Sequence, residues 1–191
     1  AQVRALKEAY GIRPGERDLA TFPLFALFGP ALGMASVVPD MDASRPADAD
    51  PQRLFEAFRD YECTNLFASP ALIDKLGRYC EDHGLALTSL RRAISAGAPA
   101  SSPALERFQR CLPDGAEVLT SYGATESLPV AMLGSREILR ETRQLTDQGG
   151  GVCVGRSAPG MDVRIVPIHD EPIESWSEDL ALPQGEIGEI V

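Results

Sequence analysis

Three dipeptides that join a helix-capping residue to a proline, Asp50-Pro51, Ser69-Pro70 and Ser102-Pro103, divide the middle of this chain into regular segments. Asp and Ser side chains accept hydrogen bonds from the free amides at a helix start, and proline is favoured at the first helical position. Each dipeptide opens a stretch whose apolar residues recur at helical spacing, and short apolar runs alternate with these stretches. The runs that we predict as strands are Leu66–Ala68, Arg92–Ala96 and Glu117–Thr120.

Helices that alternate with strands in this way predict a parallel sheet flanked by helices, which is an α/β fold. In open parallel sheets, ligands bind beyond the carboxyl ends of the strands. Gly97-Ala98-Pro99 follows one predicted strand, and Tyr122–Glu126 follows the next. We therefore expect these two segments to meet at one edge of the sheet and to form a binding site.

The segment Ser121-Tyr122-Gly123-Ala124-Thr125-Glu126 concentrates side chains that suit a nucleotide. Tyr122 can lie flat against a purine, and Gly123 lets a ligand approach the backbone closely. Thr125 can donate a hydrogen bond to a phosphate oxygen, and Glu126 is a hard oxygen ligand for Mg²⁺. The alternative interpretation is an ordinary loop with a surface glutamate.

The amino-terminal part of the chain is less regular. We expect a helix over Val3–Tyr10, a short helix around Pro30–Met34 and a short buried strand over Ala35–Val38. The stretch from Phe22 to Pro39 holds eighteen uncharged residues, which is long enough to consider a membrane span. Its prolines and glycines interrupt it too often for a spanning helix, so no transmembrane span is predicted.

After Glu126 the pattern changes. Ser135 is expected to cap a charged helix that reaches about Asp147 and ends at the glycines 149–151, for which a flexible turn is favoured over a phosphate cradle. We predict strands over 152–154, 162–166 and 187–191. The expected organisation is thus an α/β subdomain over residues 1–148, followed by the start of a β-rich subdomain over residues 149–191.

The charge and the cysteine pattern exclude several kinds of protein. With 18 basic and 28 acidic residues, the chain carries a net charge of −10, which disfavours binding to nucleic acid and to anionic membranes. The four cysteines and two histidines lack the spacing of metal ligands or of a disulfide framework. We therefore expect a reduced, cytoplasmic protein.

Several segments resemble motifs of the AMP-forming adenylating enzymes, which include acyl-CoA synthetases, luciferases and the adenylation domains of peptide synthetases. Tyr122–Glu126 resembles their Tyr-Gly-x-Thr-Glu motif, and Ser95–Pro99 resembles their adenine-site loop. Further similarities occur in the expected order along the whole chain, in the segments 22–25, 154–165 and 185–190. The chain thus looks like part of the large N-terminal domain of such an enzyme.

The resemblance implies roles for individual residues. Gly97, Ala98, Pro99 and Tyr122 would hold the adenine, and Gly123 and Ala124 are further nucleotide-binding positions. Thr125 would contact the α-phosphate and Glu126 would bind Mg²⁺, so Thr125 and Glu126 are the candidate catalytic residues. The acyl-pocket segment is formed by Phe25, Ala26, Leu27 and Phe28, for which plain core packing is the alternative. ATP and Mg²⁺ are the implied cofactors, and CoA is a possible further one.

Other motifs of the family are absent from this sequence. We find no phosphate loop before Val3, no ribose-binding Thr-Gly-Asp after Val191, and no C-terminal lid with its catalytic lysine. Many relatives carry histidine where this chain has Ala26, which leaves the shape of the acyl pocket open. The sequence is therefore interpreted as an interior piece of a longer protein that does not catalyse adenylation by itself.

Within the family, the segments 23–28, 95–99 and 172–179 are most similar to the fatty-acid–CoA ligase-like enzymes that form β-lactones in bacterial long-chain olefin biosynthesis. The resemblance implies activation of a long-chain fatty acid, or of its β-hydroxy derivative, as acyl-AMP, with enzymes of the same pathway as possible partners. One alternative is an ordinary long-chain fatty-acid–CoA ligase, and another is a non-catalytic nucleotide-binding domain. A hydrolase is disfavoured because Gly155–Gly160 does not fit the spacing of a nucleophile elbow.

Overall fold

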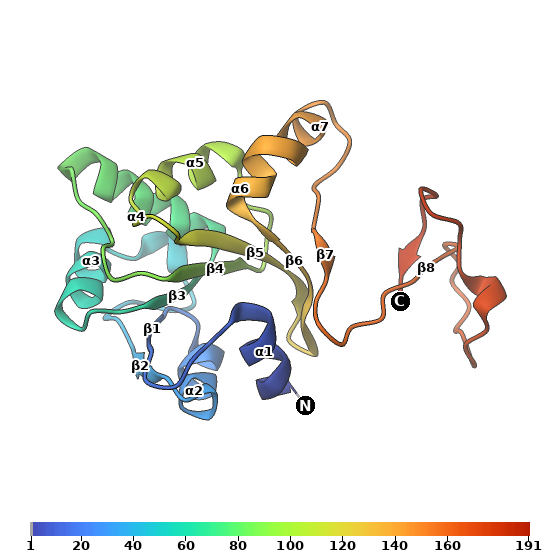
Figure 1. Ribbon diagram of the computed structural model, residues 1–191, viewed down its shortest axis with the longest axis horizontal. Coiled ribbons are helices and arrows are strands. Elements are labelled where there is room, and N and C mark those ends of the chain that lie inside the picture. Colours follow the sequence, from blue (N-terminus) through green and yellow to red (C-terminus); the bar gives the residue numbers. More distant parts are fainter. Residues whose placement is uncertain (1) are drawn as a thin grey trace. The chain divides into compact units, whose positions relative to one another are not determined.

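The computed structural model describes residues 2–191, which form two compact units divided between Pro159 and Gly160. The first unit contains a seven-stranded sheet in the order β2-β1-β3-β4-β5-β6-β7 (Figure 1). Five strands run parallel, and β6 and β7 run antiparallel to their neighbours. The strands are β1 (Arg17–Ala20), β2 (Ala35–Val37), β3 (Asn65–Ala68), β4 (Arg92–Ala96), β5 (Glu117–Ala124), β6 (Ser127–Gly134) and β7 (Arg156–Ser157).

Helices cover both faces of this sheet (Figure 1). One face packs against α1 (Gln2–Tyr10) and α2 (Pro23–Leu32), and the other packs against α3 (Pro51–Asp60), α4 (Pro70–His83) and α5 (Ser102–Arg110). Side chains alternate between the two faces of a strand, so β3 sends Phe67 into the first core and Leu66 and Ala68 into the second. The predicted α/β fold, with a parallel sheet flanked by helices, is confirmed.

The capping signals in the sequence act as expected at two of the three helices. The Asp50 side chain accepts a hydrogen bond of 2.9 Å from the amide of Gln52, and the Ser69 hydroxyl accepts one of 3.4 Å from the amide of Leu72. At the third helix, Ser101 takes the cap position one residue before Ser102 and makes no capping hydrogen bond with its side chain.

The helix that the sequence predicts around residues 30–34 was misplaced. The structure has α2 from Pro23 to Leu32, with Pro30 inside it, and Gly33 ends the helix in the left-handed conformation at φ 85°. Pro23 occupies the first turn, where its missing amide is not needed. The following strand is also less buried than expected, because β2 lies at the edge of the sheet and Ala35 is exposed.

The segment expected as a loop at residues 122–126 is mainly strand. β5 continues to Ala124 and pairs with β6 in a hairpin whose turn is Thr125-Glu126, with an irregularity in register at Gly123. The strand β6 was not predicted. Its burial alternates as a strand requires, but the sequence Ser-Leu-Pro-Val-Ala-Met-Leu-Gly is almost continuously apolar and hides this period.

The helical stretch after β6 occupies the predicted residues but is not a regular α-helix. It comprises α6 (Ser135–Glu137), a π-helical turn η2 (Ile138–Thr142) and α7 (Arg143–Asp147). Ser135 is the first helical residue rather than the cap. Its buried hydroxyl accepts a hydrogen bond of 3.2 Å from the amide of Val118 and donates one of 2.9 Å to Gln109.

The boundary between the two units lies after Pro159, later in the chain than the expected boundary at residue 148. Residues 156 and 157 belong to the first unit because β7 pairs with β6, matching Arg156 with Met132. The strand predicted over 152–154 is not formed. The second unit runs from Gly160 to Val191 and contains a two-stranded antiparallel sheet of β8 (Ile165–Val166) and β9 (Glu189–Ile190), with the short 3₁₀ turn η3 (Glu178–Leu180) between them.

Over residues 2–191, no helix has both the length and the apolar character that a membrane span requires.

Candidate functional site

A cavity of about 610 Å³ lies at the carboxyl ends of β4 and β5. Gly97, Ala98 and Pro99, which directly follow β4, form one part of its wall. Tyr122 and Gly123, near the end of β5, form another part. The structure therefore brings together the two segments that the sequence predicted to meet, and it does so at the edge of the sheet where ligands bind in this class of fold.

The backbone of the cavity leaves room for a ligand. Gly97 has a φ angle of 89°, which favours glycine, and a Cβ atom added there would meet no other atom within 4 Å. Tyr122, which lines the same cavity, is 41% exposed. Ser95, at the end of β4, is buried, and its hydroxyl oxygen has no hydrogen-bond partner among the described residues. A flat ring bound between these segments would contact the aromatic face and two glycines.

Sequence reasoning missed a third part of the wall. The stretch from α6 to α7 and the chain that follows it contribute the residues Ile138, Thr142, Thr146, Asp147, Val152, Cys153 and Val154. The four-residue spacing of positions 138, 142 and 146 is the signal that could have shown a shared helical face. Because these three positions belong to no ligand-binding motif, the sequence did not indicate that this helical face lines the cavity.

The charge of the cavity wall is unusual for a site that would accept a whole triphosphate. Among the described residues that line it, Asp147 carries the one acidic side chain, and there is no lysine or arginine. Phosphate groups are normally bound by cationic side chains, backbone amides or metal ions. The cavity wall thus fits an uncharged ring system better than it fits phosphates.

The remaining residues of the predicted motif lie outside the cavity wall. Ala124 ends β5, and Thr125 and Glu126 form the exposed turn of the hairpin. A Cβ atom at Gly123 would lie 2.4 Å from the carbonyl oxygen of Ser127, so this hairpin depends on glycine at that position. Thr125 and Glu126 follow the cavity-lining Gly123 by two and three residues in the chain.

Glu126 is a single exposed carboxylate and not part of a cage of ligands. Within residues 2–191, no group of three or more His, Cys, Asp or Glu side chains is arranged to hold a metal ion. Mg²⁺ commonly binds proteins through one or two carboxylates and otherwise through phosphates and water. One carboxylate beside a phosphate path fits an ion that arrives with a nucleotide.

The predicted acyl-pocket residues form part of α2 and do not line this cavity. The Phe25 ring is buried and stacks on Phe67 of β3, with the ring centroids 3.4 Å apart, so this side chain is a core residue in the structure. Leu27 lies on the opposite side of the helix and is 77% exposed. Ala26 and Phe28 are half-buried, so the four residues range from the core to the surface.

The helix α1 is linked to the cavity by a hydrogen bond that the sequence did not predict. Tyr10 Oη lies 2.5 Å from Oγ of Ser121, which lines the cavity next to Tyr122. Burial raises the pKa of Tyr10 to about 12, and the hydrogen bond with Ser121 opposes this rise. Tyr10 is thus a neutral group that lies against β5, the strand that carries Tyr122.

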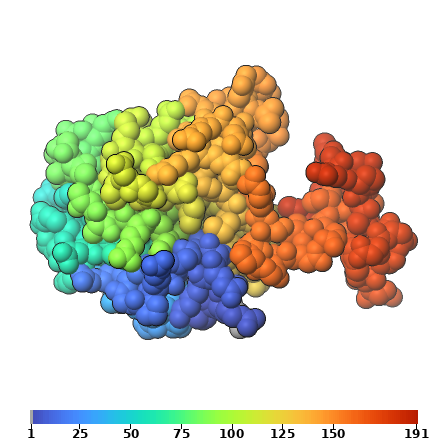
Figure 2. Space-filling view, in the orientation of Figure 1, coloured from blue at the N-terminus to red at the C-terminus, as the bar shows by residue number. Residues whose placement is uncertain are grey.

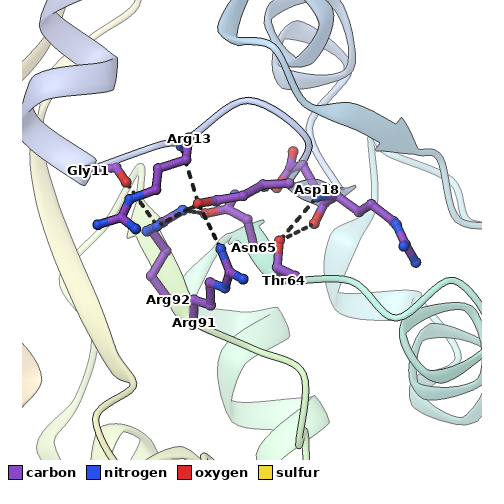
Figure 3. A network of polar contacts seen from close by, with 9 residues as sticks. Gly11, Arg13, Asp18, Thr64, Asn65, Arg91 and Arg92 are labelled. Atoms are coloured by element: carbon purple, nitrogen blue, oxygen red, sulfur yellow. Dashed lines mark hydrogen bonds and ion pairs between the residues drawn. The ribbon is translucent and has the colours of Figure 1, made fainter.

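A second polar cluster lies at the amino ends of the strands, the edge opposite the cavity (Figure 3). Its centre is the buried Glu16, which accepts a hydrogen bond of 3.1 Å from Nη2 of Arg92 and lies 3.5 Å from Nη1 of Arg91. Arg92 also donates to the carbonyl oxygen of Gly11, 3.1 Å away. These contacts join the segment between α1 and β1 to the start of β4 and stabilise the fold at a distance from the candidate site.

Asp18 in the same cluster is fully buried. Its Oδ1 accepts a hydrogen bond from the Asn65 amide, but Oδ2 has no partner among the described residues. Burial raises the pKa of Asp18 to about 7, although the hydrogen bond from Asn65 and the charge of Arg92 act in the other direction. The Asp18 carboxylate therefore binds a proton more tightly in the folded state than in the unfolded chain.

Solved structures of other proteins share this fold. An amide bond synthetase from Marinactinospora thermotolerans matches 99% of this chain, which covers 35% of that protein, at a TM-score of 0.71 and 24% identity. O-succinylbenzoate coenzyme A synthetase from Bacillus subtilis, solved in complex with ATP and magnesium ion, matches 99% of the chain over 35% of its own length at a TM-score of 0.69 and 21% identity. At these identities the likeness concerns the fold alone.

Two relatives share more sequence identity with this chain than these solved structures do. Olefin β-lactone synthetases of Stenotrophomonas maltophilia and Xanthomonas campestris are 47% and 46% identical to this chain over 189 residues, which is 99% of its length. The chain spans about a third of the length of these relatives, since it covers 33% of each. Residues 18–191 match the family of the AMP-binding enzymes, and the chain belongs to this family.

Proposed function

We propose that the protein that contains this chain activates a long-chain fatty acid, or its β-hydroxy derivative, as an acyl-adenylate. A carboxylate oxygen of the acid attacks the α-phosphorus of ATP, and the bond to the leaving pyrophosphate breaks. Two anions must be oriented and the developing charge must be neutralised, so positioning and electrostatics dominate this reaction. The proposal covers the complete protein, because this chain is about a third of its curated relatives in length.

The observation that carries the proposal is the cavity between the segments 97–99 and 122–123. Its aromatic ring and two glycines suit adenine, and the hairpin turn that follows offers a hydroxyl and a carboxylate. We assign Gly97, Ala98, Pro99, Tyr122, Gly123 and Ala124 to the adenosine end of the nucleotide. Thr125 then contacts the α-phosphate as a hydrogen-bond donor, and Glu126 holds Mg²⁺ on the phosphates.

For the product, we propose closure of a β-lactone. The β-hydroxyl oxygen of the bound acyl-adenylate attacks the acyl carbon, its proton leaves, and AMP departs with the electrons of the broken acyl–phosphate bond. The two relatives that are 47% and 46% identical bear the name olefin β-lactone synthetase, which supports this choice. The alternative is transfer of the acyl group to CoA, which the shared fold also permits.

The test uses the complete protein with ATP, Mg²⁺ and a long-chain β-hydroxy acid, without CoA, and identifies products by mass spectrometry. We expect AMP together with a product whose mass equals the acid minus water. An acyl-adenylate that persists, and that becomes a thioester when CoA is added, would instead support the fatty-acid–CoA ligase. If the protein forms no AMP with any fatty acid, adenylation itself is refuted and a non-catalytic nucleotide-binding domain becomes the better explanation.

A further inference from the structure

The helical wall of the cavity is held in place by contacts with α5. Arg143 of α7 forms an ion pair with Glu106 of α5, and Ile138 and Leu139 pack against the core beneath that helix. Figure 2 shows the two segments in contact, α5 in yellow-green and the stretch from α6 to α7 in orange. The wall is therefore part of the packed first unit and can position side chains at the cavity.

Asp147 ends this helical wall and supplies the acidic group of the cavity. Its Oδ2 lies 3.5 Å from Nε of Arg143, the same guanidinium that binds Glu106. The Asp147 side chain is 62% exposed, so this ion pair within α7 is a weak restraint on the orientation of its carboxylate. The pairing leaves further lone pairs of the carboxylate free to accept hydrogen bonds.

The charge of Asp147 decides which part of a nucleotide it can contact. A carboxylate repels phosphate oxygens and attracts N–H and O–H donors. Asp147 shares the cavity wall with Gly97 and Tyr122, whereas Thr125 and Glu126 do not line the cavity, so a ring system bound in the cavity lies within the wall that contains Asp147. Adenine presents an exocyclic amine as a donor at position 6, whereas hypoxanthine and guanine present an acceptor oxygen there.

We infer that Asp147 is a specificity residue that selects adenine over 6-oxopurines by accepting a hydrogen bond from the exocyclic amine. This inference rests on the proposed function, because it assumes that the cavity holds the base of a nucleotide. A 6-oxopurine in the same position would place its carbonyl oxygen against the carboxylate and leave both groups without a donor. Sites built around a hydrogen-bond partner discriminate strongly against analogues that lack it.

The experiment compares ATP with ITP in the complete protein and in its D147N variant. An asparagine amide can turn its N–H₂ group toward the oxygen of hypoxanthine. We therefore expect the ratio of kcat/KM for ATP to kcat/KM for ITP to fall in the variant. A fall of about tenfold corresponds to the loss of one partly exposed hydrogen bond to a charged group. Asp114→Asn is the matched control, because Asp114 is exposed and lies outside the cavity wall. It should leave the ratio unchanged.

A binding measurement separates recognition from catalysis. Calorimetric titration with ATP and with ITP, in the presence of Mg²⁺ and without a fatty acid, should show the same change in the ratio of dissociation constants in D147N. Titration with 2′-deoxyATP distinguishes the base from the ribose. If D147N loses discrimination against 2′-deoxyATP and keeps it against ITP, the carboxylate contacts the ribose and the inference is overturned.

The outcomes for this inference differ from those for the proposed function. A wild-type protein that neither binds ATP nor forms AMP refutes the proposed function. A wild-type protein that turns over ATP, together with a D147N variant whose preference for ATP over ITP is unaltered, refutes only the role of Asp147.

Discussion

Tyr10 and Ser121 are 111 residues apart in the chain, and their hydroxyl oxygens lie 2.5 Å from each other. Tyr10 is 3% exposed, and its ring belongs to the core between α1 and the sheet. Ser121 lies in β5 directly before Tyr122 and borders the cavity. The hydrogen bond therefore connects the amino-terminal helix to the strand that presents the candidate adenine-binding ring.

Replacing Tyr10 by phenylalanine removes this hydrogen bond and keeps the packed ring. We expect the KM for ATP to rise by a few fold, with kcat little changed, because Ser121 would lose a partner that orients its side chain. A net contribution of about 1 kcal/mol from one hydrogen bond corresponds to this rise in KM. Steady-state kinetics of AMP formation would measure it. Tyr61→Phe, at a tyrosine that is 58% exposed, is the control, and an equal change in both variants would contradict the role of Tyr10.

Glu126→Gln tests the proposed Mg²⁺ ligand. The amide has nearly the same shape but lacks the charge that a hard cation prefers, so we expect AMP formation to fall by about 100-fold, partly restored by a higher Mg²⁺ concentration. Pyrophosphate release with and without added Mg²⁺ would measure this. Glu8→Gln on the exposed side of α1 is the matched control. Unaltered activity of the Glu126→Gln variant at limiting Mg²⁺ would exclude Glu126 as the ligand.

Gly97→Ala and Gly115→Ala form a matched pair. The two glycines have φ angles of 89° and 88°, and a Cβ atom at either would meet nothing within 4 Å. Both substitutions should therefore cost a similar free energy of unfolding, about 1 kcal/mol, from the left-handed backbone. Only Gly97 borders the cavity, so we expect the KM for ATP to rise in Gly97→Ala alone. Equal values of KM in the two variants would argue against a nucleotide at Gly97.

Phe25→Ala and Leu27→Ala separate core packing from an acyl pocket within α2. Removing the buried ring that stacks on Phe67 should lower the free energy of unfolding by about 3–5 kcal/mol. Leu27 is 77% exposed, so its truncation should leave stability within about 0.5 kcal/mol of the wild type. Thermal unfolding measures both. A change in the KM for the fatty acid with Leu27→Ala would support the acyl-pocket hypothesis, and its absence would favour plain packing.

The buried Asp18 predicts a dependence of stability on pH. Its folded-state pKa of about 7 lies above that of an unfolded aspartate, so the folded state binds the proton more tightly. The free energy of unfolding should consequently fall as pH rises from about 4 to about 7, by at most about 4 kcal/mol, and then level off. Melting temperatures of the wild type and Asp18→Asn between these pH values would test this. The variant should lose this part of the pH dependence, and identical profiles would contradict the assignment.

Much of the fold followed from local signals. Asp50 and Ser69 cap their helices as the capping pattern predicted, and β4 runs from Arg92 to Ala96 as expected. The parallel order of the strands then predicted that the segments 97–99 and 122–126 meet; residues 97–99 and the first two residues of the second segment border one cavity. These features depend on residues close together in the chain, so hydrogen bonding and side-chain spacing were sufficient.

Other features were decided by strand pairing and side-chain packing that the sequence pattern did not show. The sequence around Thr125-Glu126 suggested a loop, but pairing of β5 with β6 extends the strand to Ala124 and leaves only a tight turn. Phe25 became a core residue because Phe67 of β3 lies against it.

By itself, then, the amino-acid sequence determined the α/β class, the starts of α3 and α4, and the edge of the sheet at which the candidate nucleotide segments meet. Only the tertiary structure decided that Asp147 and Tyr10 belong to the surroundings of that site. Asp147 arrives there because α7 packs beside α5 through Arg143 and Glu106, and Tyr10 because α1 closes one face of the sheet over Ser121. The physical reason is that local spacing fixes how a segment folds, while burial against distant segments decides where its polar groups finally lie.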